Sequence, residues 1–282
     1  MYQYNLLIAG ALWRIEYPKP LENGNCTPFV RENVNQIPNL LIRYRYGVPE
    51  IRGTLVRNTY PRLYESKEAY YVEREYISEA ATCIVVPKQM GKEYFGWVIP
   101  GKEHGIQKLD SLLTVSEFES IFSRLQGFCL HSSIIRRNGK AVLFSAPSGV
   151  GKSTQADLWK RYRGADVLNG DRALIRKFEG QWTAFGSPFA GSSGIYCDDN
   201  AVIGTVVVLE QGLKNELKPL SPAQAFQHIY AESVIPRWNK EAQLRLLDVL
   251  TTFVQEVPIV KYRCLPNQSA VEFLDDYLSR GG

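Results

Sequence analysis

From Ser145 to Thr154 the chain reads Ser-Ala-Pro-Ser-Gly-Val-Gly-Lys-Ser-Thr, directly after an apolar run typical of a strand. Gly149 and Gly151 allow the backbone to curl, so that successive amide N–H groups point into one small cavity. Lys152 adds a mobile positive charge, and the hydroxyl of Ser153 suits Mg²⁺. These residues predict a loop that binds nucleotide phosphates, with a structural turn as the plainer alternative.

One residue departs from the usual pattern, Gly-x-x-x-x-Gly-Lys-[Ser/Thr]. Ala146 stands where the first glycine belongs, and alanine does not tolerate a strongly positive φ. The rest of the pattern is present. We therefore expect the nucleotide to contact Ser148, Gly149, Val150, Gly151, Lys152, Ser153 and Thr154.

Composition limits the class of protein. The chain has 282 residues, 45% hydrophobic and 22% charged, which suits a soluble protein of one large domain or two moderate ones. The formal net charge of +4 is mild and gives no case for nucleic acid. We find no apolar run long enough to cross a membrane and no signal-peptide pattern at the start. The 5 scattered cysteines predict reduced thiols in a cytoplasmic protein, and they argue against zinc.

The character of the sequence changes near Leu109. Residues 1–108 show little helical periodicity and predict a smaller β-rich N-terminal domain of unknown role, with strands at 4–15, 40–46, 81–86 and 94–99. A capping box at Thr114 and Glu117 predicts the start of a helix. Residues 109–282 alternate between segments with helical periodicity and segments typical of strands. They predict an α/β domain with a mixed sheet. Its strands are expected at 130–136, 140–145, 167–171, 172–178, 181–185, 202–209 and 259–264, and its helices from about 152, 222 and 240, with a last one over 270–278.

The order of features around the phosphate loop resembles one family. Leu130-His131, a hairpin through Asn138-Gly139, the loop, a helix, a short strand and Gly170-Asp171-Arg172 follow one another as in HPr kinase/phosphorylases. Distant relatives of that family are the ATP-dependent phosphoenolpyruvate carboxykinases and the kinases of lasso-peptide precursors. The resemblance covers roughly residues 118–204, is weaker in the C-terminal helices, and does not include the N-terminal domain. It implies a P-loop (Walker A) kinase domain of the HPr kinase/carboxykinase type.

The resemblance also implies roles for individual residues. Lys152 and the loop amides would bind the phosphates of ATP or GTP, while Ser153 and Asp171 would bind Mg²⁺. Catalysis would involve His131, Lys152 and Asp171. Two of these have plainer interpretations: Asp171 as a turn aspartate beside Gly170, and His131 as an ordinary hydrogen-bonded strand histidine.

The family typically carries two consecutive aspartates where this chain has Gly170-Asp171. One accepts the proton of the target hydroxyl and the other binds metal. With one aspartate missing, three alternatives remain open: Asp171 combines both roles, His131 accepts the proton, or phosphoryl transfer is weak or absent.

Weaker candidates lie nearby. Arg172 could clamp a phosphate or form a surface ion pair. Ser192 and Ser193, in the Gly- and Ser-rich stretch 186–194, could contact substrate or simply belong to a connecting loop. His104 and His228 have no such support, and we expect both to be solvated.

The leading interpretation is a Mg²⁺-dependent kinase that transfers the γ-phosphoryl group of ATP to a serine hydroxyl. The acceptor would be a protein or peptide, such as the precursor of a peptide natural product. A nucleotide sensor without phosphotransfer and a small-metabolite kinase are the alternatives. The related kinases assemble into rings, so a homo-oligomer is allowed. The sequence leaves open the acceptor, the choice between ATP, GTP and pyrophosphate, and the effect of Gly170.

Overall fold

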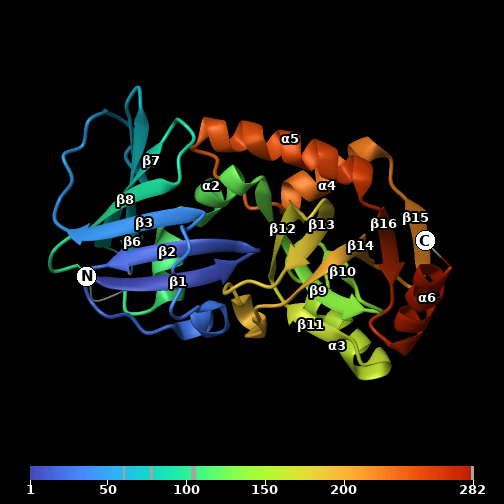
Figure 1. Cartoon of the computed structure of the whole chain (residues 1–282). Helices are drawn as coiled ribbons and strands as arrows, with labels where there is room; N and C mark the ends of the chain where they lie inside the picture. The colour runs from blue at the N-terminus through green and yellow to red at the C-terminus, as the bar shows by residue number, and fades with distance from the viewer. Residues whose placement is uncertain (60, 77–78, 103–105, 281–282) are drawn as a thin grey trace. The chain divides into compact units, whose positions relative to one another are not determined.

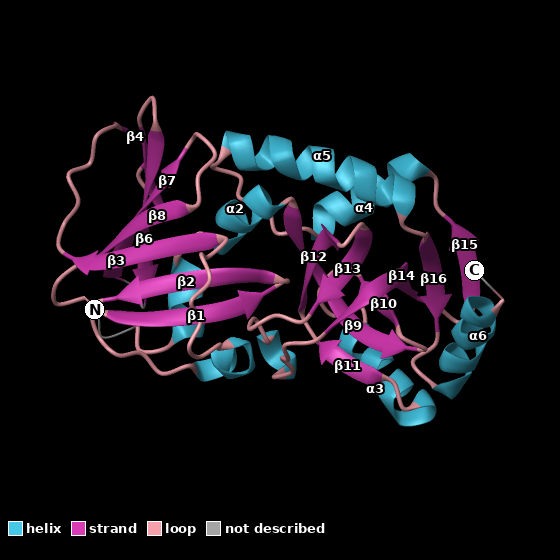
Figure 2. Cartoon of the chain, viewed as in Figure 1, coloured by secondary structure: helices cyan, strands magenta, loops and turns pink. Residues whose placement is uncertain are grey.

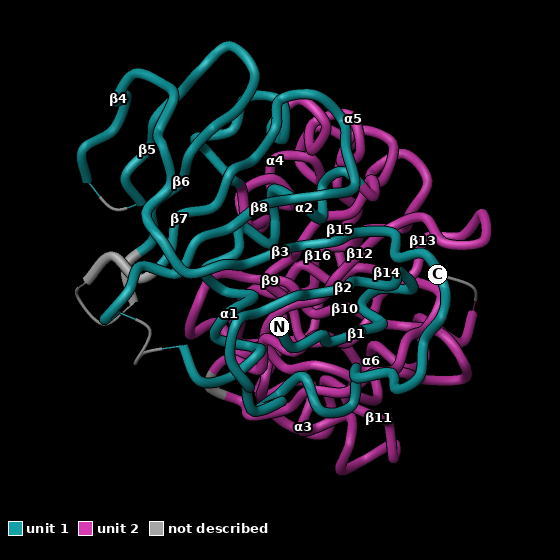
Figure 3. The backbone as a smooth tube through the Cα atoms, turned by 60° about the vertical axis from the view of Figure 1, so that its left-hand side comes forward, with its two compact units in different colours: residues 1–124, 236–243 teal, residues 125–235, 244–282 magenta. Residues whose placement is uncertain are grey.

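The structure is a computed structural model that describes residues 1–59, 61–76, 79–102 and 106–280. The chain forms two compact units (Figure 3). The first contains residues 1–124 and 236–243, and the second contains residues 125–235 and 244–282. These units divide after residue 124, whereas the sequence places a domain boundary after residue 108. As a statement about domains, that boundary stays a prediction.

The first unit is built on an eight-stranded mixed sheet within the described residues. Its strand order is β1-β2-β3-β8-β7-β6-β5-β4, with parallel pairing of β2 to β3 and of β3 to β8. The short helices α1 (Leu109–Val115) and α2 (Phe118–Phe122) follow it in the chain. The strands are β1 (Tyr2–Ile8), β2 (Ala11–Tyr17), β3 (Leu40–Tyr46), β4 (Thr54–Arg57), β5 (Arg62–Glu65), β6 (Ala69–Tyr76), β7 (Glu79–Pro87) and β8 (Glu93–Val98).

Two local expectations for this unit are wrong. The strand expected over 4–15 is a hairpin, because Ala9 and Gly10 take φ values of 51° and 67° and reverse the chain. The capping box at Thr114 and Glu117 does not form. Thr114 lies inside α1, where its hydroxyl donates to the carbonyl of Asp110 at 2.9 Å. Glu117 is instead buried in a left-handed conformation and accepts hydrogen bonds from Arg74 and Trp238.

The segment 236–243 belongs to the first unit through side-chain hydrogen bonds. Trp238 donates its indole N–H to Glu117 at 3.0 Å, and the Asn239 amide donates to the Ser120 hydroxyl at 2.8 Å. Ser120 and Asn239 are both buried. Buried polar groups are costly unless they are paired, so these bonds tie the segment to that unit specifically.

The second unit is a mixed α/β fold around one sheet, drawn by element type in Figure 2. Its strand order is β10-β9-β12-β13-β14-β16-β15, with β11 beside β9 and a further pairing of β10 with β14. The strands are β9 (Gly127–Arg137), β10 (Lys140–Ser145), β11 (Asp166–Asn169), β12 (Arg172–Phe178), β13 (Gln181–Phe185), β14 (Asn200–Gln211), β15 (Glu216–Pro219) and β16 (Ile259–Cys264).

Helices cover both faces of this sheet (Figure 1). Apolar residues of α3 (Lys152–Arg163) and α6 (Gln268–Ser279) pack in one core with Phe144, Val207 and Tyr262. On the other face, α4 (Pro222–Glu232) and α5 (Lys240–Glu256) contribute Ile229, Leu246, Leu250 and Phe253 to a second core with Leu143 and Val206. Strand residues therefore alternate between the two cores, as a sheet with both faces covered requires.

The direction of the strands decides where a site can form. Strand β14 is parallel to both β10 and β16. Strand β9 is antiparallel to β10 and to β11, so β11 runs in the direction of β10. The carboxyl ends of β10, β11, β14 and β16 consequently meet at one edge of the sheet. In open α/β sheets, ligands bind in the crevice outside the carboxyl ends of strands.

In the part of the chain that the structure describes, no helix has the length and apolar character needed to cross a membrane.

Candidate functional site

The segment predicted to bind phosphate, residues 146–151, is a loop that connects β10 to α3, and this strand–loop–helix order agrees with the sequence prediction. Gly149 and Gly151 take φ values of +82° and +118°, which favour glycine. A Cβ atom at Gly149 would meet no other atom within 4 Å, so the backbone conformation rather than crowding demands glycine there. Ala146, in place of the usual first glycine, is fully buried and has no positive φ. Alanine at this position therefore fits the loop without strain.

The first turn of α3, directly after the loop, presents backbone N–H groups that can donate hydrogen bonds. Gln155 N–H makes the first helical bond, to the carbonyl of Gly151 at 2.9 Å. Among the described residues, the N–H groups of Lys152, Ser153 and Thr154 have no hydrogen-bond acceptor, as expected for the first turn of a helix. These donors and the positive end of the helix dipole suit an anion.

Lys152 lies against the loop itself. Its ammonium group donates to the carbonyl of Ala146 at 2.7 Å and to that of Pro147 at 3.3 Å. Both acceptors are uncharged, and hydrogen bonds from an ammonium group to a charged phosphate oxygen are stronger. The lysine is thus beside the loop and able to exchange neutral acceptors for charged ones.

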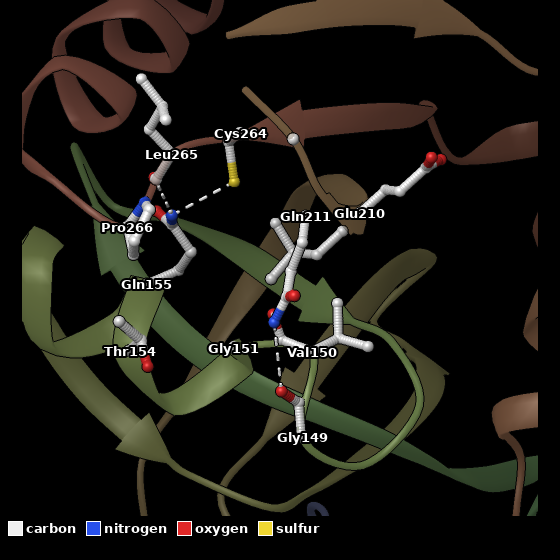
Figure 4. Close-up of a pocket in the computed structure, with 12 residues that line it drawn as sticks. Gly149, Val150, Gly151, Thr154, Gln155, Glu210, Gln211, Cys264, Leu265 and Pro266 are labelled. Atoms are coloured by element: carbon white, nitrogen blue, oxygen red, sulfur yellow. Dashed lines mark hydrogen bonds between the residues drawn. The ribbon is translucent and has the colours of Figure 1, made fainter. Parts of the chain in front are cut away.

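A cavity of about 310 Å³ adjoins the loop (Figure 4). It lies at the ends of β14 and β16, beside the start of α3, in the volume range of small-molecule sites. At its edge, the amide nitrogen of Gln211 is 3.4 Å from the carbonyl oxygens of both Gly149 and Val150. The cavity is lined by Gly149, Val150, Gly151, Thr154, Gln155, Leu209, Glu210, Gln211, Gly212, Cys264, Leu265 and Pro266.

Two further predicted residues lie together on the neighbouring strands. His131, in β9, places its Nδ1 atom 3.9 Å from Oδ1 of Asp171, which follows β11. Their side chains are 41% and 31% exposed. The N–H of Ser132 donates to the carbonyl of Asp171 at 3.1 Å, and Ser132 pairs with Ser145 at the end of β10. Hydrogen-bonded strands thus place Asp171 and the start of the loop between β10 and α3 at the same edge of the sheet, with one strand between them.

Asn169 holds Asp171 in place, a role that the sequence analysis missed. The Asn169 side chain is fully buried, and its oxygen accepts from the N–H groups of Asp171 and Arg172 at 2.8 and 2.7 Å. Its amide nitrogen donates to the carbonyl and hydroxyl of Ser187, both at 3.2 Å. The sequence contains a signal for this role, an asparagine at the point where a strand passes into a turn. Asparagine side chains in turns often form a hydrogen bond with the backbone two residues later in the chain.

The loop that contains Ser193 packs on Gly170. A Cβ atom at residue 170 would lie 2.2 Å from Oγ of Ser193 and 2.5 Å from its Cβ. The Ser193 hydroxyl in turn donates to the carbonyl of Ala190 at 2.8 Å and accepts from the N–H of Ile195 at 3.2 Å. A second aspartate cannot stand beside Asp171 unless Ser193 moves. This gives a physical reason for the glycine.

The remaining candidates are Arg172, Ser192 and Ser193, and the structure shows side-chain contacts for Arg172 and Ser193. The guanidinium of Arg172 lies 5.5 Å from the centre of the Phe189 ring, and its Nε lies 3.8 Å from the carboxylate of Asp171. Ser192 belongs to the short 3₁₀ helix Gly191–Ser193, and its side chain is not described. The contacts of Ser193 place it against Gly170. Whether either serine meets a substrate stays a prediction.

His228 is the main correction. It was expected to be solvated, but its ring on α4 is half-buried and Nε2 lies 3.2 Å from the Ser145 hydroxyl. Burial, together with the charges of Lys261 and Lys152, lowers the pKa of His228 to about 4. Since the Ser145 hydroxyl donates to the carbonyl of His131 at 3.2 Å, a neutral His228 donates from Nε2.

A sequence signal for His228 existed: apolar Ala225 precedes it by three positions on the predicted helix, and residues three apart lie on the same helix face. The other histidine expected to be solvated, His104, lies outside the described residues.

The donor set can be tested against Mg²⁺. Ser153 is exposed in the first turn of α3, and Asp171 makes no ion contact closer than 3.8 Å. A hydroxyl and a carboxylate are hard oxygen ligands, which Mg²⁺ combines with substrate phosphates and water. Among the described residues no cluster of three or more His, Cys, Asp or Glu side chains could hold a metal. Ser153 and Asp171 are therefore of the ligand type that Mg²⁺ prefers.

No family model matches the chain, and no curated protein matches its sequence. Among solved structures, the HPr(Ser) kinase/phosphatase from Coxiella burnetii is similar, with a TM-score of 0.31 and 9% sequence identity. The match covers 54% of this chain and 92% of that one. The chain is a mixed α/β protein with two mixed sheets, and it has a weak structural resemblance to that kinase.

Proposed function

We propose that the second unit binds a nucleoside triphosphate at the 146–154 loop and transfers its γ-phosphoryl group to a hydroxyl. The observation that carries this proposal is the unpartnered amide donors of Lys152, Ser153 and Thr154, as far as the structure is described, beside the Lys152 ammonium. These groups lie next to the cavity at the sheet edge. Phosphoryl transfer depends mainly on positioning and charge neutralisation, which such an edge can supply.

Each residue has a task in this proposal. The loop amides and Lys152 hold the β- and γ-phosphates and neutralise their charge. Ser153 and Asp171 would hold Mg²⁺, which when bound offsets charge on the phosphates. Asp171 or His131 accepts the proton of the attacking hydroxyl. Nδ1 of His131 and Oδ1 of Asp171 lie 3.9 Å apart. A hydroxyl placed beside one of these groups is therefore close to the other, and either the carboxylate or the imidazole could take its proton.

The acceptor that we favour is a serine hydroxyl of a protein or peptide, and ATP is the expected donor. The N-terminal unit offers a β-sheet whose terminal strand β4 has four exposed residues, Thr54–Arg57. An extended peptide could add to such an edge through backbone hydrogen bonds. This supports a peptide acceptor over a small metabolite.

One observation favours a second function, a nucleotide sensor without phosphotransfer. Ser193 fills the space that a side chain at Gly170 would need, so a second aspartate is excluded at that position in this conformation. With only Asp171 to serve both metal and proton, chemistry would be slower while nucleotide binding remained intact.

The test combines binding and transfer. Calorimetric titration of the wild-type protein with MgATP should show binding, and Lys152→Ala should weaken it at least about tenfold, since a charged partner of the phosphates is lost. Incubation with γ-labelled ATP and fractionated extract of the source cells should then label a protein or peptide at serine. Tight binding with no label in any acceptor favours the nucleotide sensor. Label in a small metabolite favours a small-metabolite kinase. No binding of any nucleoside triphosphate contradicts the proposal.

A further inference from the structure

The side chain of Gln211 connects the end of β14 to the loop between β10 and α3 (Figure 4). Its amide nitrogen lies 3.4 Å from the carbonyl oxygen of Gly149 and 3.4 Å from that of Val150. A carbonyl oxygen only accepts hydrogen bonds, so the NH₂ group of Gln211 faces the loop, with one hydrogen for each oxygen. The contact joins residues that are 62 and 61 positions apart in the chain.

The backbone that carries Gln211 is anchored on both sides by β16. Gln211 is paired with Cys264 in the parallel register, and the N–H of Gly212 donates to the carbonyl of Cys264 at 3.1 Å. A Cβ atom at Gly212 would lie 2.1 Å from Cγ of Arg263, so the arginine packs directly on that glycine. Arg263 in turn donates from Nε to the carboxylate of Glu210 at 3.1 Å. The end of β14 is therefore a fixed base from which Gln211 reaches the loop.

The loop itself contains a peptide group that can rotate. Rotation about ψ of Val150 and φ of Gly151 would turn the peptide between them without moving the Val150 side chain, which packs against the core between the sheet and helices α3 and α6. Gly151 opposes this rotation little, because it has no Cβ and the nearest atom to an added Cβ would be that of Thr154 at 3.9 Å. Local sequence allows the curled conformation, and a partner outside the loop is needed to restrain it.

The direction of that peptide decides whether the loop offers a donor or an acceptor. In a trans peptide, the carbonyl of Val150 and the N–H of Gly151 point in opposite directions. A hydrogen bond from Gln211 to this carbonyl therefore also fixes the direction of the Gly151 N–H. Among the described residues, that N–H has no acceptor, like the N–H groups of residues 152–154. Rotation of the peptide would replace this donor with a carbonyl oxygen, which repels an anion.

We propose that Gln211 is a positioning residue for phosphate binding, which restrains the loop so that the Gly151 N–H stays available to a phosphate oxygen. This inference rests on the proposed nucleotide binding, and it adds a residue from β14 that prepares the loop before the nucleotide arrives. A donor that is already oriented loses less conformational entropy when the ligand binds. Gln211 is itself exposed, so its effect is on the loop rather than on the stability of the fold.

The test compares wild type with Gln211→Met, which keeps the length of the side chain and removes its donors. In the nucleotide-free proteins, ¹⁵N relaxation should give amide order parameters of about 0.85 for Val150 and Gly151 in wild type and below about 0.6 in the variant. Calorimetric titration with MgATP should show about 3- to 10-fold weaker binding by the variant. Gln181→Met, at the exposed first residue of β13, is the matched control and should change neither quantity.

The two measurements separate positioning from other roles. Weaker binding by Gln211→Met with an unchanged order parameter would mean that the side chain contacts the nucleotide directly, and would overturn the inference. Loss of order with unchanged affinity would also overturn it, as would a fall in order throughout the second unit with a lower urea midpoint. If wild type binds no nucleoside triphosphate, the proposed function fails, while the relaxation data still decide whether Gln211 restrains the loop.

Discussion

The imidazole Nε2 of His228 lies 3.2 Å from the hydroxyl oxygen of Ser145, the last residue of β10. The same hydroxyl reaches the carbonyl of His131 at 3.2 Å. A helix on one face of the sheet is thereby joined to the end of β10 and to β9. Because burial and two lysines lower the pKa of His228, this link is made by the neutral ring.

The stability of the protein should consequently depend on pH below neutrality. The pKa of His228 falls from its usual 6.5 to about 4 on folding, so the unfolded chain binds the extra proton first as pH falls. The contribution of His228 to the free energy of unfolding is complete above pH 6.5. It is lost as the pH falls from 6.5 to about 4. Between pH 7 and 5 the loss should be about 2 kcal/mol. Urea unfolding at both pH values should show this loss in the wild type and not in His228→Gln; an equal loss in both proteins would assign it to other groups.

Replacing Asp171 with Asn should separate binding from chemistry. The amide keeps the size of the side chain but cannot accept a proton and is a poorer ligand for Mg²⁺. We expect MgATP affinity within a few fold of wild type and phosphoryl transfer reduced at least about 100-fold. Asp276→Asn, at an exposed position of α6, is the matched control and should change neither. Normal turnover by Asp171→Asn would remove that residue from the mechanism.

Gly170 should not accept even a methyl group. The added Cβ would meet Ser193 at 2.2 Å, so Gly170→Ala should lower the free energy of unfolding by about 1–3 kcal/mol. Adding Ser193→Gly should recover part of that loss, because it removes the atoms in conflict. Denaturant titration of the single and double variants measures the coupling. If the two changes simply add, the contact between residues 170 and 193 is not the cause.

Asn169 should matter to activity through the backbone of Asp171. Asn169→Ala would leave the N–H groups of Asp171 and Arg172 without their acceptor, at a cost of about 1–3 kcal/mol in stability. We also expect slower phosphoryl transfer with MgATP affinity little changed, since the loop at 146–154 is untouched. Asn200→Ala, at an exposed strand position, serves for comparison. A uniform loss of affinity and rate would indicate a general structural effect instead.

Short segments of the sequence predicted many helices and strands of the second unit correctly. The helix start at Lys152, the hairpin at Asn138-Gly139 and strands β10 and β12 agree with the pattern-based boundaries. Each depends on neighbours within a few residues: glycines that allow positive φ, short continuous runs of apolar residues in the strands, and a helix with Ala156 and Trp159 on one face. Where the local signal was weak, as at Ala9-Gly10 and Glu117, the boundaries were wrong.

The sequence by itself determined the conformation of the loop between β10 and α3, because its glycines act within one continuous stretch of backbone. The tertiary structure decided the surroundings of that loop: Gln155 with Leu265, His228 with Ser145, and Gly170 with Ser193. The residues of these pairs are 110, 83 and 23 positions apart. A contact across such separations depends on strand order and on which side chains share a face of the sheet, and both follow from packing of the whole unit.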